Sequence, residues 1–523
     1  MESIVRIASL VPRIVPADPE RNVSAMLALI EKAAALMPDL YVFPALCIPG
    51  GDLGALQQSR AMQQSLTHAL EMLCDATCGI NAYIVAGTQC VVDGTAQSCA
   101  VVLHKGDVVG CITENGENGG NANRFTCGGL QFSVLPISGS LLPDTIPYSA
   151  QLTILSAACT PDAAALAKLP SRLQAQSTGH ALCISSLGFC NSAYGRVYKG
   201  VAGIFEDGET LGLKIEETEE LCCICDIDAG LLPDMAQDGI FPCHRITPNA
   251  RKSELLRPVS KNPFLPADAN EAVATLKNLF DLQVTALFNK LGGSPLRKIV
   301  IGVSGGLDST LALLVCHAAL VRLGLPPENL IGVTMPGFGT TGRTYQNACS
   351  LIRALGATLR EVPIADVVTV HFHDIGHRAE VHDATYENAQ ARERTQILLD
   401  IANQEGALVA GTGDLSEIAL GFCTFGGDNI SHYNVNASVP KTVIRRLVDY
   451  LAAGELFFPA ASTLKDILDT PISPELLPSS DGETIGQKTE EILGPYELHD
   501  FFLYYFVKYG FAPSKIYRSE ERR

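Results

Sequence analysis

The apolar residues divide the chain into two halves, each of which alternates between strand-like and helix-like segments. In the N-terminal half, short apolar runs suited to strands occur at Val5 to Leu10, Leu40 to Phe43, Ala82 to Gly87 and Cys99 to Leu103. Apolar residues recur at helical spacing between them, in segments such as Val23 to Met37 and Ala61 to Cys74. This alternation predicts a layered α/β domain.

The C-terminal half has the pattern of buried strands. Apolar, β-branched runs lie at Lys298 to Val303, Leu330 to Met335, Leu359 to Ile364 and Ala407 to Gly411. Segments long enough for helices separate these runs, which is typical of a doubly wound parallel sheet. Residues 246–268 are polar and contain prolines, so we predict a linker there, between domains at 1–245 and 269–523.

Length, composition and charge narrow the class of protein. A chain of 523 residues fits two hydrophobic cores better than one, and 47% apolar against 18% charged residues is globular composition. A net charge of -18 without a basic stripe argues against nucleic-acid binding. The start of the chain alternates like a strand and no run is long enough to span a bilayer, so we expect a cytoplasmic protein that does not bind membranes.

The seventeen cysteines are irregularly spaced, which favours reduced, buried thiols over a disulfide framework. Cys222, Cys223 and Cys225, with Cys243 and His244 downstream, leave a zinc site open as an alternative. The segment LCCICDID is also a good apolar strand that enters an acidic turn, and this interpretation is favoured.

A glycine-rich loop, SGGLDS, lies between an apolar strand and an apolar helix. Backbone amides and the helix N-terminus converge there on the place where an anion would bind. Asp308 would repel a phosphate unless a divalent cation lay between them, so the loop predicts Mg-ATP. It lacks the lysine of Walker-type loops, and a turn without a ligand stays open. The predicted ATP-binding residues are Ser304, Gly305, Gly306, Leu307, Asp308 and Ser309.

SGGLDS resembles the loop of ATP pyrophosphatases, which adenylate a carboxylate or carbonyl and release pyrophosphate. Five downstream blocks resemble NAD+ synthase in the family's order: VTMPGFGTTGRTYQNA at 333–348, YENAQARERTQILLD at 386–400, GTGDLSEIALGFCTFGGDNISHYNVNASVPKT at 411–442, LDTPISPELLP at 468–478 and GPYELHDFFLYYFVKYGF at 494–511. The resemblance is to the long bacterial form, in which a nitrilase-like glutaminase domain, an α-β-β-α sandwich, precedes a synthase domain of the adenine nucleotide alpha hydrolase type.

This resemblance implies an ATP-dependent ligase. It would adenylate the nicotinate carboxylate of deamido-NAD, and ammonia would then attack the acyl adenylate to give NAD+, AMP and pyrophosphate. The family also implies Mg2+ and a homodimer or a larger homo-oligomer. Two alternatives stay open: a non-catalytic nucleotide-binding paralogue that scaffolds or regulates an intact synthase, and another amidating ATP pyrophosphatase of the GMP-synthase kind.

The resemblance also implies roles for polar residues after the loop. Asp308 and Lys441 would be catalytic, Thr412 would bind ATP, and Asp308 with Glu417 would hold the metal ion. Arg392 and Arg394 lie two residues apart on a predicted helix and diverge, so only one is expected to face the site. The predicted substrate-binding residues are Asn388, Arg392, Glu417, Asp428 and Lys441.

The N-terminal half departs from the glutaminase pattern at three places. The family's glutamate lies in an FPEL-like motif, where this chain has Phe43-Pro44-Ala45-Leu46. Glu114 stands near the expected lysine, and the expected cysteine block reads PISGSL at 136–141. The chemistry needs the cysteine as nucleophile, the glutamate to carry a proton and the lysine to stabilise the oxyanion. We therefore predict a degenerate glutaminase and ammonia as the direct donor.

The synthase half also departs from the pattern at two places. Gly342 replaces a carboxylate in the family's GTTDRT-like block. The sequence stops at IYRSEERR, before the family's basic C-terminal segment, which is expected to weaken closure over the acyl adenylate.

Overall fold

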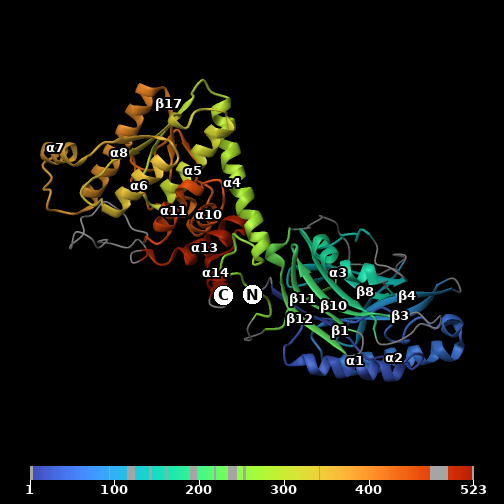
Figure 1. The fold of residues 1–523 in the computed structure, drawn as a ribbon. Helices are drawn as coiled ribbons and strands as arrows, with labels where there is room; N and C mark the ends of the chain where they lie inside the picture. The colour runs from blue at the N-terminus through green and yellow to red at the C-terminus, as the bar shows by residue number, and fades with distance from the viewer. Residues whose placement is uncertain are drawn as a thin grey trace. The chain divides into compact units, whose positions relative to one another are not determined.

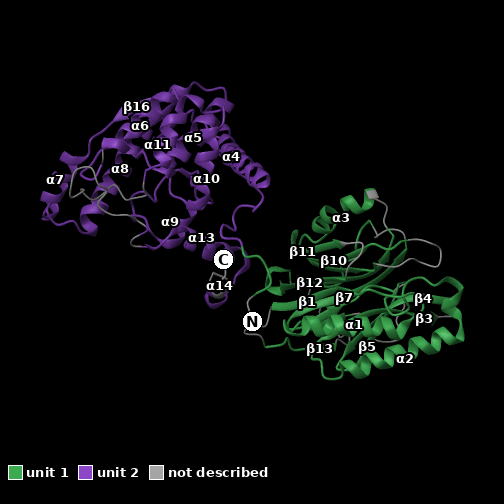
Figure 2. Ribbon diagram, turned by 60° about the horizontal axis from the view of Figure 1, so that its bottom comes forward, with its two compact units in different colours: residues 1–259, 522 green, residues 260–521, 523 purple. Residues whose placement is uncertain are grey.

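The computed structural model describes residues 4–92, 95–114, 124–139, 144–160, 163–188, 197–216, 220–233, 244–250, 255–340, 342–470, 490 and 493–520. They form two compact units, residues 1–259 and 260–521 (Figure 2). The boundary between Val259 and Ser260 falls inside the stretch 246–268.

The first unit contains two mixed sheets. The six-stranded sheet has the order β12 (Leu221–Asp228), β1 (Ile4–Val11), β2 (Leu40–Val42), β3 (Tyr83–Val92), β4 (Thr95–His104) and β5 (Asp107–Thr113). The seven-stranded sheet has the order β11 (Glu209–Glu216), β10 (Gly200–Glu206), β9 (Ala181–Ser186), β8 (Leu152–Cys159), β7 (Leu130–Gly139), β6 (Arg124–Cys127) and β13 (His244–Ile246). Because β13 pairs with β6, this unit extends beyond residue 245.

Helices cover the outer faces of these sheets (Figure 1). The facing sheets share one core, to which β1 contributes Ile7 and β7 contributes Phe132. Helices α1 (Pro19–Ala34) and α2 (Arg60–Thr77) pack on the six-stranded sheet, and α3 (Ala163–Gln176) packs on the other. The predicted α-β-β-α sandwich is confirmed.

The second unit contains a parallel sheet of five strands. Its order is β16 (Thr358–Glu361), β15 (Leu330–Thr334), β14 (Lys298–Gly302), β17 (Ala407–Gly411) and β18 (Tyr433–Asn434). The chain moves outward from β14 to β16 and then returns to β17 on the other side of β14. The carboxyl ends of β14 and β17 thus form a topological switch point, where open α/β sheets bind ligands.

Helices lie on both faces of this sheet, as predicted for a doubly wound fold. One face packs against α4 (Ala269–Gly292), α5 (Leu307–Arg322), α6 (Gly342–Ala354), α10 (Lys441–Ala453) and α11 (Ala461–Leu468). The other packs against α7 (Ala365–Ile375) and α8 (Ala384–Glu405). The short helix α9 (Leu415–Leu420) follows β17, and α13 (Tyr496–Tyr509) and α14 (Pro513–Glu520) come last.

The segment LCCICDID forms β12, paired with β1 along its whole length. The strand interpretation is therefore confirmed. Cys243, the downstream member of the zinc alternative, lies outside the described residues. Within the described part of the chain, cysteines are free thiols and no helix combines the length and apolarity needed to cross a membrane.

Candidate active site at the switch point

The SGGLDS loop connects β14 to the start of α5. Gly306 is the residue before the first turn of α5, and the hydroxyl of Ser309 donates to its carbonyl at 3.1 Å. The Gly306 amide donates to the Ser304 hydroxyl at 3.2 Å. Leu307 packs into the core of the unit, so it can contribute only its backbone to a ligand. The loop is therefore folded by its own hydroxyls around a helix N-terminus, the arrangement that binds phosphate.

Gly305 is a position where only glycine fits. Its φ of +92° lies in the left-handed region, and a Cβ there would stand 2.2 Å from the carbonyl oxygen of Thr344 in α6. The loop backbone consequently lies directly against the first turn of α6, which a side chain at this position would push away.

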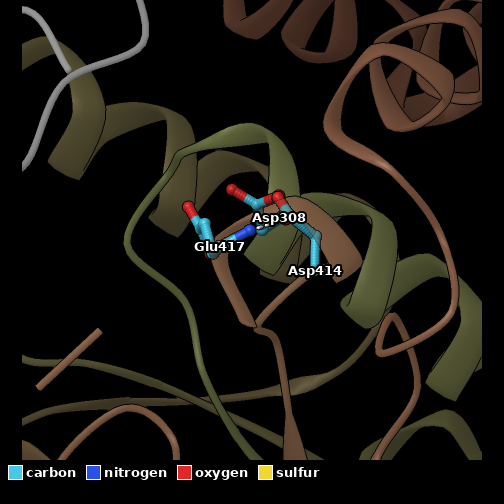
Figure 3. A group of neighbouring side chains, drawn as sticks. All are labelled: Asp308, Asp414 and Glu417. Atoms are coloured by element: carbon cyan, nitrogen blue, oxygen red, sulfur yellow. Dashed lines mark hydrogen bonds between the residues drawn. The ribbon is translucent and has the colours of Figure 1, made fainter. Parts of the chain in front are cut away.

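One lysine and three carboxylates form the centre of the site. The Lys441 Nζ lies 2.6 Å from Asp308 Oδ2, 2.7 Å from Asp414 Oδ2 and 2.7 Å from Glu417 Oε1. Figure 3 shows the three carboxylate side chains gathered at one point. Lys441 is only 2% exposed and Asp414 is fully buried. This cluster, Lys441 with Asp308, Asp414 and Glu417, is called the acidic cluster below.

Helix ends hold the acidic cluster in place. Asp308 lies in the first turn of α5, and Lys441 is the first residue of α10. Asp414 caps α9 by accepting the Glu417 amide at 2.7 Å. The Lys441 amide donates to Ser416, whose hydroxyl donates in turn to the buried carboxylate of Asp500. The four charged side chains are thus fixed by three helix starts and their buried supports.

Three acids share one cation, and the pKa values of two of them, Asp414 and Glu417, are raised. Burial, with the neighbouring carboxylates, raises the pKa of Asp414 to about 8 and that of Glu417 to about 7. Burial lowers the pKa of Lys441, but the three carboxylates outweigh burial and hold that pKa well above its ordinary value. The lysine therefore stays charged while Asp414 and Glu417 titrate near neutral pH.

The raised pKa of Glu417 predicts a pH-dependent stability. A carboxyl whose pKa is higher in the folded state stabilises the fold at low pH, and this contribution is lost as pH rises through the folded pKa, here about 7. Compared with Glu417→Gln, the metal-free wild type should lose free energy of unfolding between about pH 5 and pH 8, by at most ~1.4 kcal/mol per pH unit. Urea unfolding at several pH values measures this difference.

The matched control is Glu455→Gln, because the side chain of Glu455 is exposed in the same unit. This variant should follow the wild type at every pH. Parallel pH profiles for the wild type and Glu417→Gln would contradict the prediction.

A cavity of about 490 Å³ opens beside the acidic cluster, a volume suited to a nucleotide-sized ligand. Of the predicted ATP-binding and substrate residues, the cavity wall includes Ser304 to Ser309, Asn388, Thr412, Glu417, Asp428 and Lys441. Asn388 and Asp428 both hold Thr424: Asn388 accepts from its hydroxyl at 2.9 Å and Asp428 from its amide at 2.7 Å. They therefore shape the wall as well as line it.

Of the two arginines on α8, the structure places Arg394 in the cavity wall. Its Nε donates to the Met335 carbonyl at 3.1 Å. Arg392 is exposed, is absent from the described cavity wall and donates to the Phe425 carbonyl at 3.1 Å. A two-residue step on a helix turns the side chains apart, so only Arg394 of the pair borders the described cavity, and a substrate role for Arg392 stays a prediction.

Sequence reasoning missed two residues of the site. Asp414 completes the acidic cluster, and the spacing D-L-S-E, with an N-cap acid three residues before Glu417, is a capping signal that could have revealed it. Asn436 donates to the carbonyls of Asp308 and Thr412 at 2.9 and 3.1 Å and so ties the loop to the end of β17. No local sequence pattern predicts a hydrogen-bond bridge between segments this far apart in the chain.

The acidic cluster has the chemistry of a magnesium site. Asp308, Asp414 and Glu417 are the only described residues that gather as a group of potential metal ligands, and carboxylate oxygens are what Mg2+ prefers. Asp308 Oδ1 is buried and has no hydrogen-bond partner among the described residues. The donor set therefore fits the ion that the family implies.

In the first unit, the structure describes two positions at which the sequence was predicted to depart from the glutaminase pattern. Ala45 is fully buried at the turn after β2. Both oxygens of the Glu114 carboxylate bind Ser138, which donates its amide at 2.9 Å and its hydroxyl at 2.6 Å. Ser138 lies in the block where the cysteine is expected, whose last residues, 140 and 141, fall outside the described chain. The structure thus pairs an acid with a serine here.

Known proteins are similar in sequence to the second unit, and for some of them the similarity also covers the first unit. A family model described as NAD synthase matches residues 279–521. The glutamine-dependent NAD(+) synthetase of Mycobacterium bovis is 32% identical over 98% of this chain and 84% of its own. That of Mycobacterium leprae is 46% identical over 52% of this chain and 41% of its own. A solved Acinetobacter baumannii glutamine-dependent NAD+ synthetase with ADP aligns with 99% of this chain and 92% of its own at 19% identity, with a TM-score of 0.37 too low to add to these matches.

Proposed function

Because this chain belongs to the glutamine-dependent NAD+ synthetase family, we propose that it makes NAD+ by amidating deamido-NAD with ammonia as the direct nitrogen donor. The observation that carries this proposal is the acidic cluster at the carboxyl ends of β14 and β17, beside a phosphate-binding loop and a cavity of nucleotide size. The enzyme class is that of a ligase that forms a carbon–nitrogen bond.

The proposed reaction has two steps. A nicotinate carboxylate oxygen attacks the α-phosphorus of ATP, and the bond to pyrophosphate breaks. Ammonia then attacks the nicotinoyl carbon, AMP leaves with the bonding electrons, and the nitrogen loses a proton to give the amide. Adenylation makes this second step possible, because AMP is a far better leaving group than the oxygen of a free carboxylate.

The residues of the second unit have defined tasks in this scheme. The loop amides and the start of α5 bind phosphate oxygens. Lys441 keeps its positive charge within the site and stabilises negative charge that builds up on the phosphate. Arg394 supplies a second cation at the cavity wall. A magnesium ion held by Asp308 and Glu417 would neutralise phosphate charge when bound.

Three features of the first unit support ammonia over glutamine. Ala45 cannot carry a proton, and Glu114 has the wrong charge to stabilise an oxyanion. The hydroxyl of Ser138 is a weak nucleophile, and its bond to a carboxylate gives it no strong base. Glutamine hydrolysis by this unit therefore lacks its three chemical components at these positions.

The test supplies purified protein with deamido-NAD and Mg-ATP, and either ammonium or glutamine. We expect NAD+ and pyrophosphate with ammonium, and a rate at least about a hundredfold lower with glutamine alone, since the nucleophile and its activating groups are absent. Turnover with glutamine at the ammonium rate would overturn the nitrogen assignment. Absence of pyrophosphate release with ATP and deamido-NAD would instead indicate a non-catalytic paralogue.

A further inference from the structure

The first unit has a cavity of its own, of about 240 Å³. Its wall includes residues from β3, β4 and β7 and from the turn after β2. Among the described residues that line it there is no lysine, arginine or histidine, and the side chains are largely polar. The polar residues of the wall include Asp52, Gln57, Gln89, Ser98 and Ser138.

Two buried side chains in this wall each have an oxygen atom without a hydrogen-bond partner among the described residues. Gln89 on β3 and Ser98 on β4 are paired neighbours in the sheet, and are 7% and 8% exposed. Among the described residues, neither the Gln89 Oε1 nor the Ser98 hydroxyl has a hydrogen-bond partner. A buried polar atom left unpaired costs free energy, so both atoms favour a ligand that bonds to them.

The orientation of Gln89 is fixed by its neighbour. Its amide nitrogen donates to the Gln57 carbonyl at 3.2 Å, and turning the amide over would place two oxygens against each other. The side-chain nitrogen of Gln57 donates to Asp52 Oδ1 at 3.0 Å. One N–H of each amide is thereby used within the protein, and the Gln89 Oε1 remains an acceptor without a described partner, on a residue of the cavity wall.

Ser138 adds another acceptor. Its hydroxyl proton is directed at Glu114, so its oxygen can only accept from a ligand. Asp52 contributes the negative charge of the lining. The wall also includes the neutral side chains of Gln97, Thr160 and Tyr198, but its one charged residue is an acid and it has no described cation. Such a lining favours a cationic group with several N–H donors over an anion.

We propose that the cavity lined by Gln89, Ser98, Ser138 and Asp52 binds a primary ammonium group, from the free ammonium ion or a small primary amine. Its volume exceeds the roughly 30 Å³ that one water occupies in the liquid, so a small amine fits as well as an ion with waters. The site is separate from the acidic cluster, and it binds rather than reacts.

The test is calorimetric titration of the full-length protein with methylammonium chloride, without ATP or deamido-NAD and at constant ionic strength. We expect saturable binding that weakens about tenfold or more in Gln89→Met and in Ser98→Ala, because each removes an acceptor from a charged donor. Ser98→Ala removes an unpartnered hydroxyl, so it should fold normally. Glu417→Gln, altered only in the second unit, should bind like the wild type.

Further ligands separate the possible results. Tetramethylammonium, which has no N–H, should not bind, and binding equal to that of methylammonium would overturn the proposal. So would tighter binding of neutral acetamide, or methylammonium affinity that survives both substitutions. Tighter binding of ammonium identifies the free ion as the ligand, whereas tighter binding of methylammonium identifies a small amine. Ammonia-dependent NAD+ synthesis should be unchanged in Gln89→Met. If the wild type made no NAD+ from ammonia, the proposed function would be wrong, but the methylammonium binding result would stand.

Discussion

Replacement of Lys441 by methionine is expected to lower the kcat of ammonia-dependent NAD+ formation by about a hundredfold to a thousandfold. Methionine has a similar length but no charge, so the cavity wall would lose a buried cation. The negative charge of the three carboxylates would also repel the nucleotide phosphates, because the lysine that they contact would be gone. Steady-state assays with saturating ammonium, ATP and deamido-NAD measure this loss.

The same replacement has a stability effect with a defined pH dependence. Removing one partner of a buried ion pair costs about 3–5 kcal/mol when the remaining charge cannot be neutralised. Asp414 and Glu417 have pKa values raised to about 8 and about 7, so they take up protons readily at lower pH. The loss of stability should therefore be smaller at about pH 6 than at about pH 8.

Lys465→Met is the matched control, since Lys465 is an exposed lysine on α11 of the same unit. Its kcat and stability should stay close to those of the wild type. A Lys441→Met enzyme that kept wild-type kcat would show that the lysine only balances the carboxylates and takes no part in the reaction.

Asp308→Asn should shift the magnesium dependence of the enzyme. The amide has nearly the same size but no charge, and the buried Oδ1 that fits a cation is lost as a carboxylate ligand. We expect the Mg2+ concentration for half-maximal activity to rise at least about tenfold, with kcat lowered about a hundredfold even at saturating Mg2+. Initial rates across a magnesium titration, at fixed ATP, give both values.

Asp366→Asn provides the comparison, because Asp366 also lies in the first turn of a helix, α7, but is exposed to solvent. Both substitutions remove the same favourable interaction with a helix N-terminus. An equal magnesium shift in the two variants would assign the effect of Asp308 to its helix and not to a metal ion.

The sequence predicted the layers of both units because buried strands leave a strong local pattern. Ile299, Val300 and Ile301 are all fully buried in β14, and a short continuous apolar run of this kind is typical of a strand covered on both faces. The SGGLDS loop was equally clear, since it combines glycines and hydroxyls in a short span between a strand and a helix.

The parts that the sequence did not predict depend on tertiary contacts. Asp414 becomes part of the site only because α10 brings Lys441 to it, and Asn436 matters only because it bridges β17 and α5. The bond between Glu114 and Ser138 likewise joins β7 to a residue after β5. Residue spacing along the chain does not predict such long-range contacts, whereas it does predict the capping of α9.

The close approach of Gly305 to Thr344 has an electrical consequence. It places the starts of α5 and α6 against each other, and both border the cavity. The dipole of each helix acts as roughly half a positive charge at its first turn, so the backbone alone supplies about one unit of positive charge there. A triphosphate bound between the N-termini of α5 and α6 is attracted by this backbone charge. The SGGLDS loop therefore does not need the lysine that Walker-type loops carry.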